Sequence, residues 1–252
     1  MKSLILILLV FIPNLSNAQL DYKAENLVRV FPTAFYIKGT AGYSIPFYGA
    51  GEKVLFGYIR PSLTLQSAAV VNMARAQIDF NPISILNFYY AKSYTIRNFE
   101  NLSNFDCTNI ICSADIKRDH YGFRVAVKYR SFYYSGALNY NIGELDQATK
   151  EDWADELSSL VNTGSRSILV QQLHILGHEL SKKLSLGYLG LYNKMNNNNQ
   201  KSLMHIGFGK YIFNDEWTII AGMGVFETRF QSKNLTAISL LTWAPERGLP
   251  LF

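Results

Sequence analysis

Along most of the chain, apolar and polar side chains alternate in stretches of about 9 to 15 residues, separated by short breaks rich in Gly, Asn, Asp and Lys. The clearest stretch is His120–Arg130, in which Tyr121 and Phe123 fall on one side of a strand and Arg124 and Lys128 on the other. Such a strand has one apolar face and one basic face. A soluble sheet turns the apolar face inward, whereas a membrane-spanning barrel turns it toward lipid and lines its lumen with the polar face.

The same alternation predicts an all-β domain of about ten strands, with roughly eight to twelve compatible with the pattern. The predicted strands are Thr33–Phe47, Val54–Ala68, one strand within Ala76–Arg97, His120–Arg130, Ser131–Glu144, Ser167–Leu180, Lys183–Met195, Ser202–Phe213, Trp217–Phe230 and Thr236–Trp243. The count is open near Asn81-Pro82, which fits either a strand or a turn. Pro245 and Pro250 leave it equally open whether Ala244–Phe252 continues the last strand.

The connections differ in length, and the two long ones, Asn98–Arg118 and Leu145–Gly164, fall on the same side of an up-and-down sheet. The alternation of sides also places the turn Tyr48–Lys53 with them and the connection around Val71 on the other side. Long loops on one side and short turns on the other are typical of transmembrane barrels.

The N-terminus predicts export. Lys2 precedes the apolar run Leu4–Ile12, and Ser16-Asn17-Ala18 is a small-residue cleavage site, so residues 1–18 read as a signal peptide and residues 19–252 as the mature barrel domain. The apolar run is shorter than the roughly 20 residues that a spanning helix needs.

On these residues the mature chain resembles a Gram-negative outer-membrane β-barrel protein, and its last residue, Phe252, resembles the C-terminal aromatic of such proteins. The resemblance is one of architecture and reaches no functionally defined family. It implies a multi-pass protein of the cell outer membrane after signal-peptide cleavage. The implied partners are outer-membrane lipid, lipopolysaccharide and the outer-membrane assembly machinery, together with a possible small solute or extracellular ligand.

The chain is basic, with a formal net charge of +5 and a sequence pI near 9.0. Its charges are spread over many segments rather than clustered, and an exported chain rarely meets nucleic acid, so we expect no nucleic-acid partner.

Charges on the polar face point to the lumen, because a charge facing lipid costs about 2–4 kcal/mol at the bilayer midplane. The predicted lumen-lining charges are Lys38, Arg60, Arg124, Lys128, Glu227 and Arg229. They can pair into a filled interior, or they can line a narrow, mainly basic water path.

Two further features lie in the long loops. Cys107 and Cys112 predict a local disulfide in an exported protein, with two free thiols as the alternative. In Leu145–Gly164, the residues Trp153, Leu157 and Leu160 recur at helical spacing and predict a short helix. That acidic segment is expected to act as a lid, as a constriction facing a basic wall, or as a surface for a partner.

No catalytic, cofactor or metal site is predicted. His174 and His178 would share one face of a strand but lie roughly 13 Å apart, too far for one metal ion. Asp119 and His120 are adjacent, so they face opposite ways on a strand. Outer-membrane phospholipases use a Ser–His pair, but neither His120 nor His205 is followed by a Ser two residues later.

The sequence therefore predicts a non-enzymatic, integral outer-membrane protein with a structural or surface-interaction role and a mostly filled lumen. The alternative is a narrow porin-like channel for small, preferentially anionic solutes. An outer-membrane hydrolase and a soluble lipocalin-like binder are the remaining, weaker interpretations.

Overall fold

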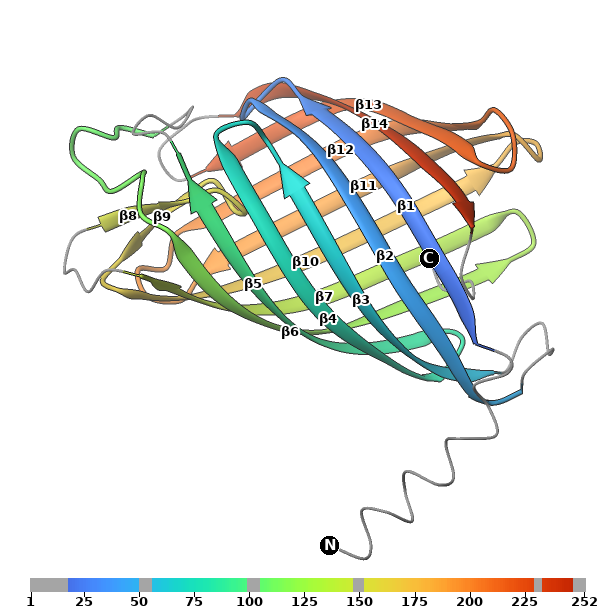
Figure 1. Cartoon of the computed structure of the whole chain (residues 1–252). Helices are drawn as coiled ribbons and strands as arrows, with labels where there is room; N and C mark the ends of the chain where they lie inside the picture. Colours follow the sequence, from blue (N-terminus) through green and yellow to red (C-terminus); the bar gives the residue numbers. More distant parts are fainter. Residues whose placement is uncertain (1–17, 50–55, 99–104, 147–151, 229–232, 247–252) are drawn as a thin grey trace, which may run out of the picture.

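The protein is a closed antiparallel barrel of twelve strands, shown by a computed structural model that describes residues 18–49, 56–98, 105–146, 152–228 and 233–246 (Figure 1). The barrel strands are β1 (Gln19–Arg29), β2 (Ala34–Tyr48), β3 (Gly57–Ser67), β4 (Val71–Ile83), β5 (Leu86–Arg97), β6 (Ile116–Tyr129), β7 (Phe132–Leu145), β10 (Arg166–Glu179), β11 (Leu184–Met195), β12 (Lys201–Ile212), β13 (Trp217–Thr228) and β14 (Asn234–Glu246). Each pairs with its neighbours along the chain, and β14 pairs with β1. Within the described residues, no helix is long and apolar enough to span a bilayer.

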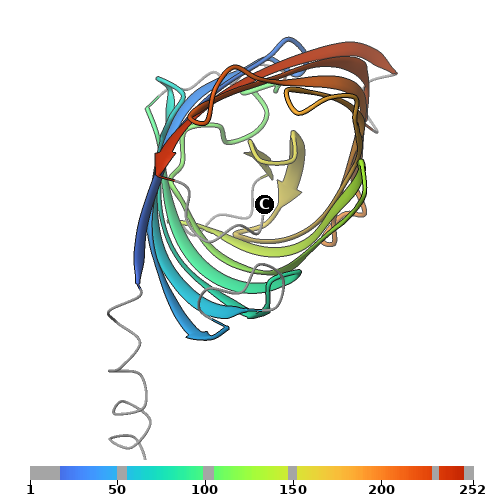
Figure 2. The same ribbon diagram turned by 90° about the vertical axis from the view of Figure 1, so that its right-hand side faces the viewer.

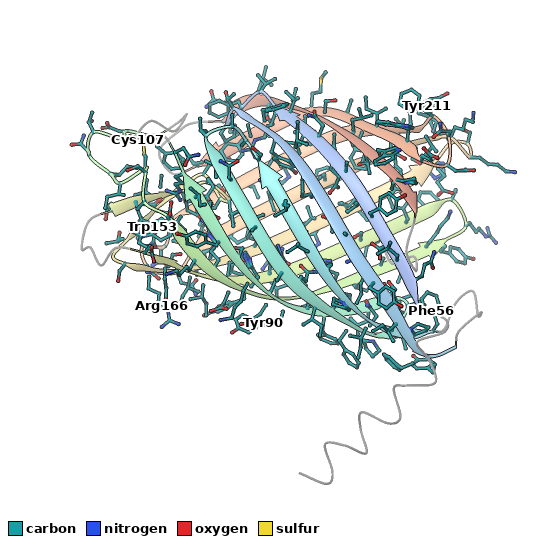
Figure 3. The ribbon with its side chains drawn as sticks, viewed as in Figure 1. Phe56, Tyr90, Cys107, Trp153, Arg166 and Tyr211 are labelled. Atoms are coloured by element: carbon teal, nitrogen blue, oxygen red, sulfur yellow. A yellow bond between two sulfur atoms is a disulfide. The ribbon has the colours of Figure 1, made fainter. Side chains whose placement is uncertain are left out.

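The outer face of the barrel is apolar around most of its circumference, and side chains cover it from end to end (Figure 3). On β2 the outward Ile37 is 55% exposed, and on β3 the outward Leu65 is 59% exposed. On β6, Tyr121 and Phe123 are also exposed, while the next residue, Arg124, forms its contacts with inward residues. This placement overturns the soluble lipocalin-like interpretation, which required the aromatic row to face inward.

The strand count is higher than the ten that the alternation predicted. Gln19–Arg29 forms β1, which was missed because Ala24 and Asn26 interrupt its outward apolar row and Leu27 interrupts its charged inward row. The stretch expected to hold one strand, Ala76–Arg97, holds the end of β4 and all of β5. Pro82 lies where the register of this pair shifts, so it is accommodated by an irregularity rather than by a turn.

These two additional strands change which connections share an end of the barrel. The segments between β5 and β6 and between β7 and β10 lie at one end, called the loop end here, as predicted. The connection between β2 and β3 lies at the opposite end, called the terminal end because β1 starts and β14 finishes there. The β3–β4 turn joins the loop end, so the predicted sides of these two connections were reversed.

The ring closes through residues from the two extremities of the described chain. β14 continues to Glu246, past the predicted end at Trp243, because a register shift opposite Tyr22 and Ala24 accommodates Pro245. At the loop end, the backbone nitrogen of Val30 donates to the carbonyl of Ala237 at 3.0 Å.

The predicted helix around Trp153 is absent from the described residues, and a hairpin of β8 (Asp152–Asp155) and β9 (Leu160–Thr163) takes its place. Trp153 lies in β8, Leu157 in the turn and Leu160 in β9. The helical spacing was coincidental, because Ser159 adopts φ 59° and reverses the chain. Figure 2 shows this hairpin within the outline of the ring.

Candidate functional site

The first half of the barrel carries a wall of ion pairs on its inner face. The Lys38 Nζ atom lies 2.6 Å from Glu25 Oε2, and Lys23 Nζ lies 3.4 Å from the same oxygen. On the next strands, the Arg60 Nε atom donates to Asp21 Oδ2 at 2.8 Å, while its Nη1 atom lies 3.5 Å from Asp79. The charges on β1 to β4 are therefore paired along the wall rather than across the lumen.

Gly42 makes the Arg60 contact possible. Asp21 is on β1 and Arg60 on β3, so the guanidinium must cross β2, and it does so directly over Gly42. A Cβ atom at that position would clash with the guanidinium. The glycine is thus a gap in the inner surface that lets a long side chain reach two strands away.

A second crossing brings two arginines to one aromatic ring. The guanidinium carbon of Arg124 lies 4.5 Å from the ring centroid of Tyr89, and that of Arg75 lies 5.3 Å from it. Tyr89 donates to Asn139 Oδ1 at 2.7 Å, over Gly122 of the intervening β6. Arg124 Nη1 is 3.8 Å from Asp79, the carboxylate that Arg60 also approaches.

The other half of the barrel has an apolar inner wall. Buried side chains on β12 and β13 form a cluster, and half-buried side chains of neighbouring strands pack around it. The buried members are Met204, Ile206, Phe208 and Phe226, and the half-buried ones are Phe31, Ile175, Leu189, Leu191, Ile220 and Ile238.

Strand order places these two walls opposite each other. In a ring of twelve strands, positions half a circuit apart are β4 and β12, β5 and β13, and β6 and β14. The arginine pair on β4 and β6, with Tyr89 on β5 between them, therefore faces the apolar cluster of β12 to β14.

The β8–β9 hairpin is fastened to the barrel wall by two buried arginines. Arg118 of β6 contacts Asp155 at 2.8 Å and Glu156 at 2.7 Å, and the side chains of Arg118 and Asp155 are each only 2% exposed. Arg97 of β5 pairs with Glu156 and donates to the carbonyl of Ala154 at 2.7 Å. Burying such ions is tolerable only because each one meets an opposite charge.

The far side of the hairpin is attached to β12 and the turn before it. Ser202 donates to the carbonyl of Ser158 at 2.9 Å, and the Val161 backbone nitrogen donates to Gln200 Oε1, also at 2.9 Å. Leu160 packs with Leu169 of β10 and Met195 of β11. The anchors thus run along the arc from β5 to β12, and the hairpin crosses the mouth at the loop end.

Glu156 is the hairpin carboxylate whose protonation would weaken the attachment to Arg97 and Arg118. Burial alone would raise the pKa of Glu156, but Arg118 and Arg97 outweigh it and hold the pKa at about 2. The carboxylate therefore stays ionised, and the hairpin stays fastened, well below neutral pH.

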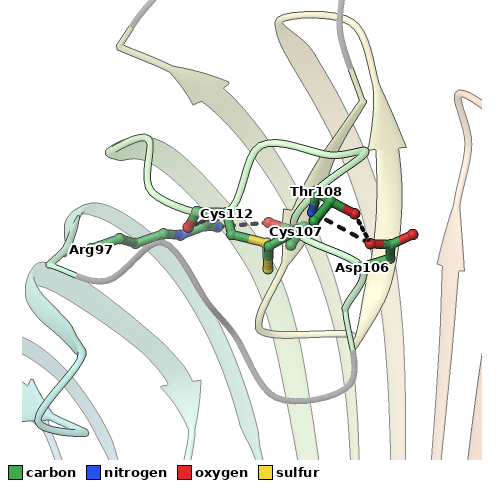
Figure 4. The surroundings of a disulfide bond; sticks show 6 residues. Arg97, Asp106, Cys107, Thr108 and Cys112 are labelled. Carbon is green, nitrogen blue, oxygen red and sulfur yellow. Dashed lines mark hydrogen bonds between the residues drawn. A yellow bond between two sulfur atoms is a disulfide. The ribbon is translucent and has the colours of Figure 1, made fainter.

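The predicted disulfide is present and supports the hairpin from outside. Cys107 and Cys112 are bonded in the connection between β5 and β6, and Arg97 Nη1 donates to the Cys112 carbonyl at 3.2 Å (Figure 4). Ile111, inside the same small ring, exchanges backbone hydrogen bonds with Asp152 and Ala154. The disulfide loop therefore adds a single parallel bridge alongside β8.

Below the hairpin, a chain of polar side chains follows the inner wall from β5 to β12. Ser93 lies 2.8 Å from His120 Nε2, and His120 Nδ1 lies 2.6 Å from Asn141 Oδ1. The chain continues through Gln171 and Asn193 to Ser202.

The start of this chain, Ser93–His120–Asn141, has the linkage of a nucleophile, base and orienting group. The sequence did not reveal it, because the three residues come from three strands. Ser93, His120 and Asn141 are all buried, and each hydrogen bond is one link in the longer chain, so we interpret it as a structural belt.

The predicted lumen charges are distributed unevenly. Lys38, Arg60 and Arg124 lie in the ion-paired wall described above, and Lys128 contacts Glu179 at 2.7 Å near the terminal end. Glu227 lies on the exposed row beside the buried Phe226, so it does not belong with them. Arg229 lies outside the described residues.

The sequence missed four inward-facing arginines. Arg29, Arg75 and Arg118 fell outside the predicted strands, and Arg97 ended the stretch Ala76–Arg97 without being assigned to either face.

The histidines that suggested a metal motif lie on the outward row of β10. His174 Nδ1 is 2.9 Å from the Tyr134 hydroxyl, and His178 packs on Phe132 with ring centroids 4.4 Å apart. Across the described ranges, no three His, Cys, Asp or Glu side chains gather in a way that could hold a metal ion.

No protein-family model matches the chain, and no curated protein matches it. Solved structures of similar fold include the KdgM porin, with 11% identity and a TM-score of 0.47 over 88% of this chain and 98% of that one. The NanC porin has 6% identity and a TM-score of 0.48 over the same shares. An outer membrane channel from Pseudomonas putida F1 has 7% identity and a TM-score of 0.47 over 90% of this chain and 94% of that one. At the level of architecture, the chain resembles outer-membrane β-barrel proteins.

Proposed function

We propose that this protein is a narrow channel of the outer membrane that passes small solutes, with a preference for anions. The closed ring leaves no unpaired sheet edge among its twelve strands, and its exposed apolar face fits the hydrocarbon of a bilayer. This placement agrees with the predicted signal peptide at residues 1–18.

The observation that carries the proposal is the course of the hairpin. Among the described residues, its anchors occupy the arc from β5 to β12, and none of them reaches the arc of β13, β14 and β1 to β4, which we assign to passage. An inward-folded segment that narrows a barrel without filling it is what a small-solute channel needs. A barrel of twelve strands is also wider than the eight-stranded kind that side chains fill.

This proposal replaces the filled, purely structural lumen that the sequence favoured. The ion pairs of Arg60, Lys38 and Arg124 run between strands one or two apart, so they hold the charges against the wall. A plug would need such pairs to join opposite walls.

Anion preference is supported by the charge balance of the wall. The carboxylates of Asp21, Glu25 and Asp79 are shared among Lys23, Lys38, Arg60 and Arg124, and Arg75 has no carboxylate partner among the described residues. Unneutralised cations in a confined lumen raise the local concentration of anions.

The test is to insert the mature chain into planar bilayers and to measure the reversal potential across a KCl gradient. We expect small, stable conductance steps and a reversal potential on the chloride-selective side. The double substitution Arg124→Glu and Lys128→Glu should move that potential toward potassium. Lys117→Glu, on the outward exposed row, is the matched control and should leave it unchanged. Absence of conductance from correctly folded protein contradicts the proposal.

A further inference from the structure

The interior of this barrel is two-faced. Membrane barrels generally have polar interiors. Here Leu189, Leu191 and Ile220 remain half-buried on the inner wall, and they extend the buried cluster around Ile206 and Phe226. A hydrated inorganic ion or a sugar gains nothing from apolar surface, so this wall indicates a solute with an apolar part.

The opposite wall offers guanidinium groups that are incompletely occupied. The Nε atom of Arg75 is buried and has no hydrogen-bond partner among the described residues, and its Nη2 atom donates to Gln77 at 2.6 Å. Arg124 shares Asp79 with Arg60 at the long distance of 3.8 Å, and its side chain is 34% exposed. Both guanidiniums lie against the ring of Tyr89, which fixes their planes.

We propose that the solute is an amphipathic monoanion, a carboxylate with an aromatic or aliphatic body; this inference rests on the proposed channel function. The carboxylate is received by Arg75 and Arg124, whose planar groups match its two oxygens, and the body lies against the apolar wall of β11 to β14. Because β4 and β6 are opposite β12 and β14 in the ring, one molecule in the lumen meets both walls.

The hairpin reinforces this selection. The arc that it leaves beside itself is bounded by β13 and β14 on one side and by β1 to β4 on the other. A solute on that path has the half-buried Ile220 and Ile238 on one flank and the charged wall on the other. A sugar acid of the same charge would need hydrogen-bonding groups on both flanks, and the cluster on β12 to β14 offers it hydrocarbon.

The experiment compares phenylacetate with acetate as blockers of the KCl current in planar bilayers containing the mature chain. Both carry one carboxylate, so only the phenyl ring differs. We expect half-block by phenylacetate at a concentration roughly tenfold lower than by acetate, because burial of a phenyl group contributes at least that much affinity.

Two sets of variants separate the walls. Arg75→Gln with Arg124→Gln should raise the half-blocking concentration of both acids. Leu189→Gln, or the milder Ile220→Thr if the former does not fold, should raise that of phenylacetate and leave acetate unchanged. Ile219→Thr lies on the outward row next to Ile220 and is the matched control. Retention of heat-modifiable gel migration establishes that each variant is folded.

The outcomes distinguish this inference from the proposed function. Conductance with equal block by the two acids, or phenylacetate block unchanged in folded Ile220→Thr and Leu189→Gln, overturns the amphipathic solute and leaves the channel intact. Absence of conductance in the wild-type chain overturns both.

Discussion

The inner walls of the two halves of this barrel are built differently, although their outer faces are alike. β1 to β6 carry ion pairs inside, whereas β10 to β14 carry a packed apolar cluster inside. Outside, both halves present exposed apolar side chains, such as Leu65 on β3 and Leu186 on β11. The outer face contacts a single apolar medium and is therefore apolar in both halves. The inner face has no such common constraint, so its two halves can differ in charge and hydrophobicity.

The largest effect should come from placing a charge in the apolar wall. Ile206 is fully buried, so Ile206→Asp leaves a carboxylate without a partner and should destabilise the barrel by about 4 kcal/mol or more. The same residue type beside the charged wall, introduced by Asn139→Asp on β7, still accepts the Tyr89 hydrogen bond and should change stability by roughly 0.5 kcal/mol or less. Urea midpoints in detergent measure both. Similar midpoints for the two variants would remove the distinction between the walls.

The next largest effect concerns the β8–β9 hairpin, which crosses the mouth of the barrel. Arg118→Leu leaves Asp155 buried without its ion pair, at a cost of about 3–5 kcal/mol, and should release the hairpin. Lys117→Leu removes the neighbouring exposed pair with Asp146 and should cost roughly 0–1 kcal/mol. Limited proteolysis at residues 152–163 reports release. Equal protection of the hairpin in both variants is the result that contradicts its anchoring by Arg118.

Acid should loosen the attachment of the same hairpin to the barrel wall. The pKa of Glu156 is depressed from 4.5 to about 2, so its contribution is complete above about pH 4.5 and disappears as the pH falls toward 2. Cleavage of the hairpin by an acid-active protease should therefore rise between pH 4.5 and 2 in the wild type. Glu156→Gln, which cannot titrate, should show a flat response over that range, and a rise equal to that of the wild type counts against this assignment.

A smaller effect separates two glycines of one strand. Gly42→Ala displaces the Arg60 guanidinium and weakens its contact with Asp21, at roughly 1 kcal/mol. Gly39→Ala meets no atom within 4 Å and should be neutral or slightly stabilising. We also expect the anion selectivity of the channel to change in Gly42→Ala and to stay unchanged in Gly39→Ala. Identical reversal potentials in the two variants would show that Arg60 keeps its place.

The smallest effect concerns the belt of hydrogen-bonded polar side chains below the hairpin. Ser93→Ala removes one hydrogen bond to His120 and should cost about 0.5–1.5 kcal/mol. A fluorophosphonate probe, which marks activated serines, should leave Ser93 unlabelled. Stoichiometric labelling that is lost in Ser93→Ala would show that Ser93 is an activated nucleophile and would contradict a purely structural role.

The sequence predicts the outer face well because each strand carries its own alternation. Residues 120–130 are sufficient to assign Tyr121 and Phe123 outward and Arg124 inward. β1 escapes the same pattern because Ala24 and Asn26 make its outward row only weakly apolar and Leu27 stands on its inward row.

The inner site was predictable only in part, because its contacts join residues far apart in sequence. Arg97 finds Glu156, and Arg118 finds Asp155, only after the long connections have folded back. The apolar inner wall was missed for a related reason. On β12 the inward row with Ile206 and Phe208 is more apolar than the outward row, which holds His205 and two glycines, so alternation assigns the wrong row to lipid.

The seam between β1 and β14 sets the order of events during biogenesis. Val30 and Thr236 meet partners about 200 positions away, so the ring cannot shut until the last strand has been delivered. Until then, both terminal strands expose a full ladder of backbone donors and acceptors, which hydrocarbon does not tolerate. A nascent molecule cut short before Asn234 would therefore be expected to remain an open sheet in need of a chaperone.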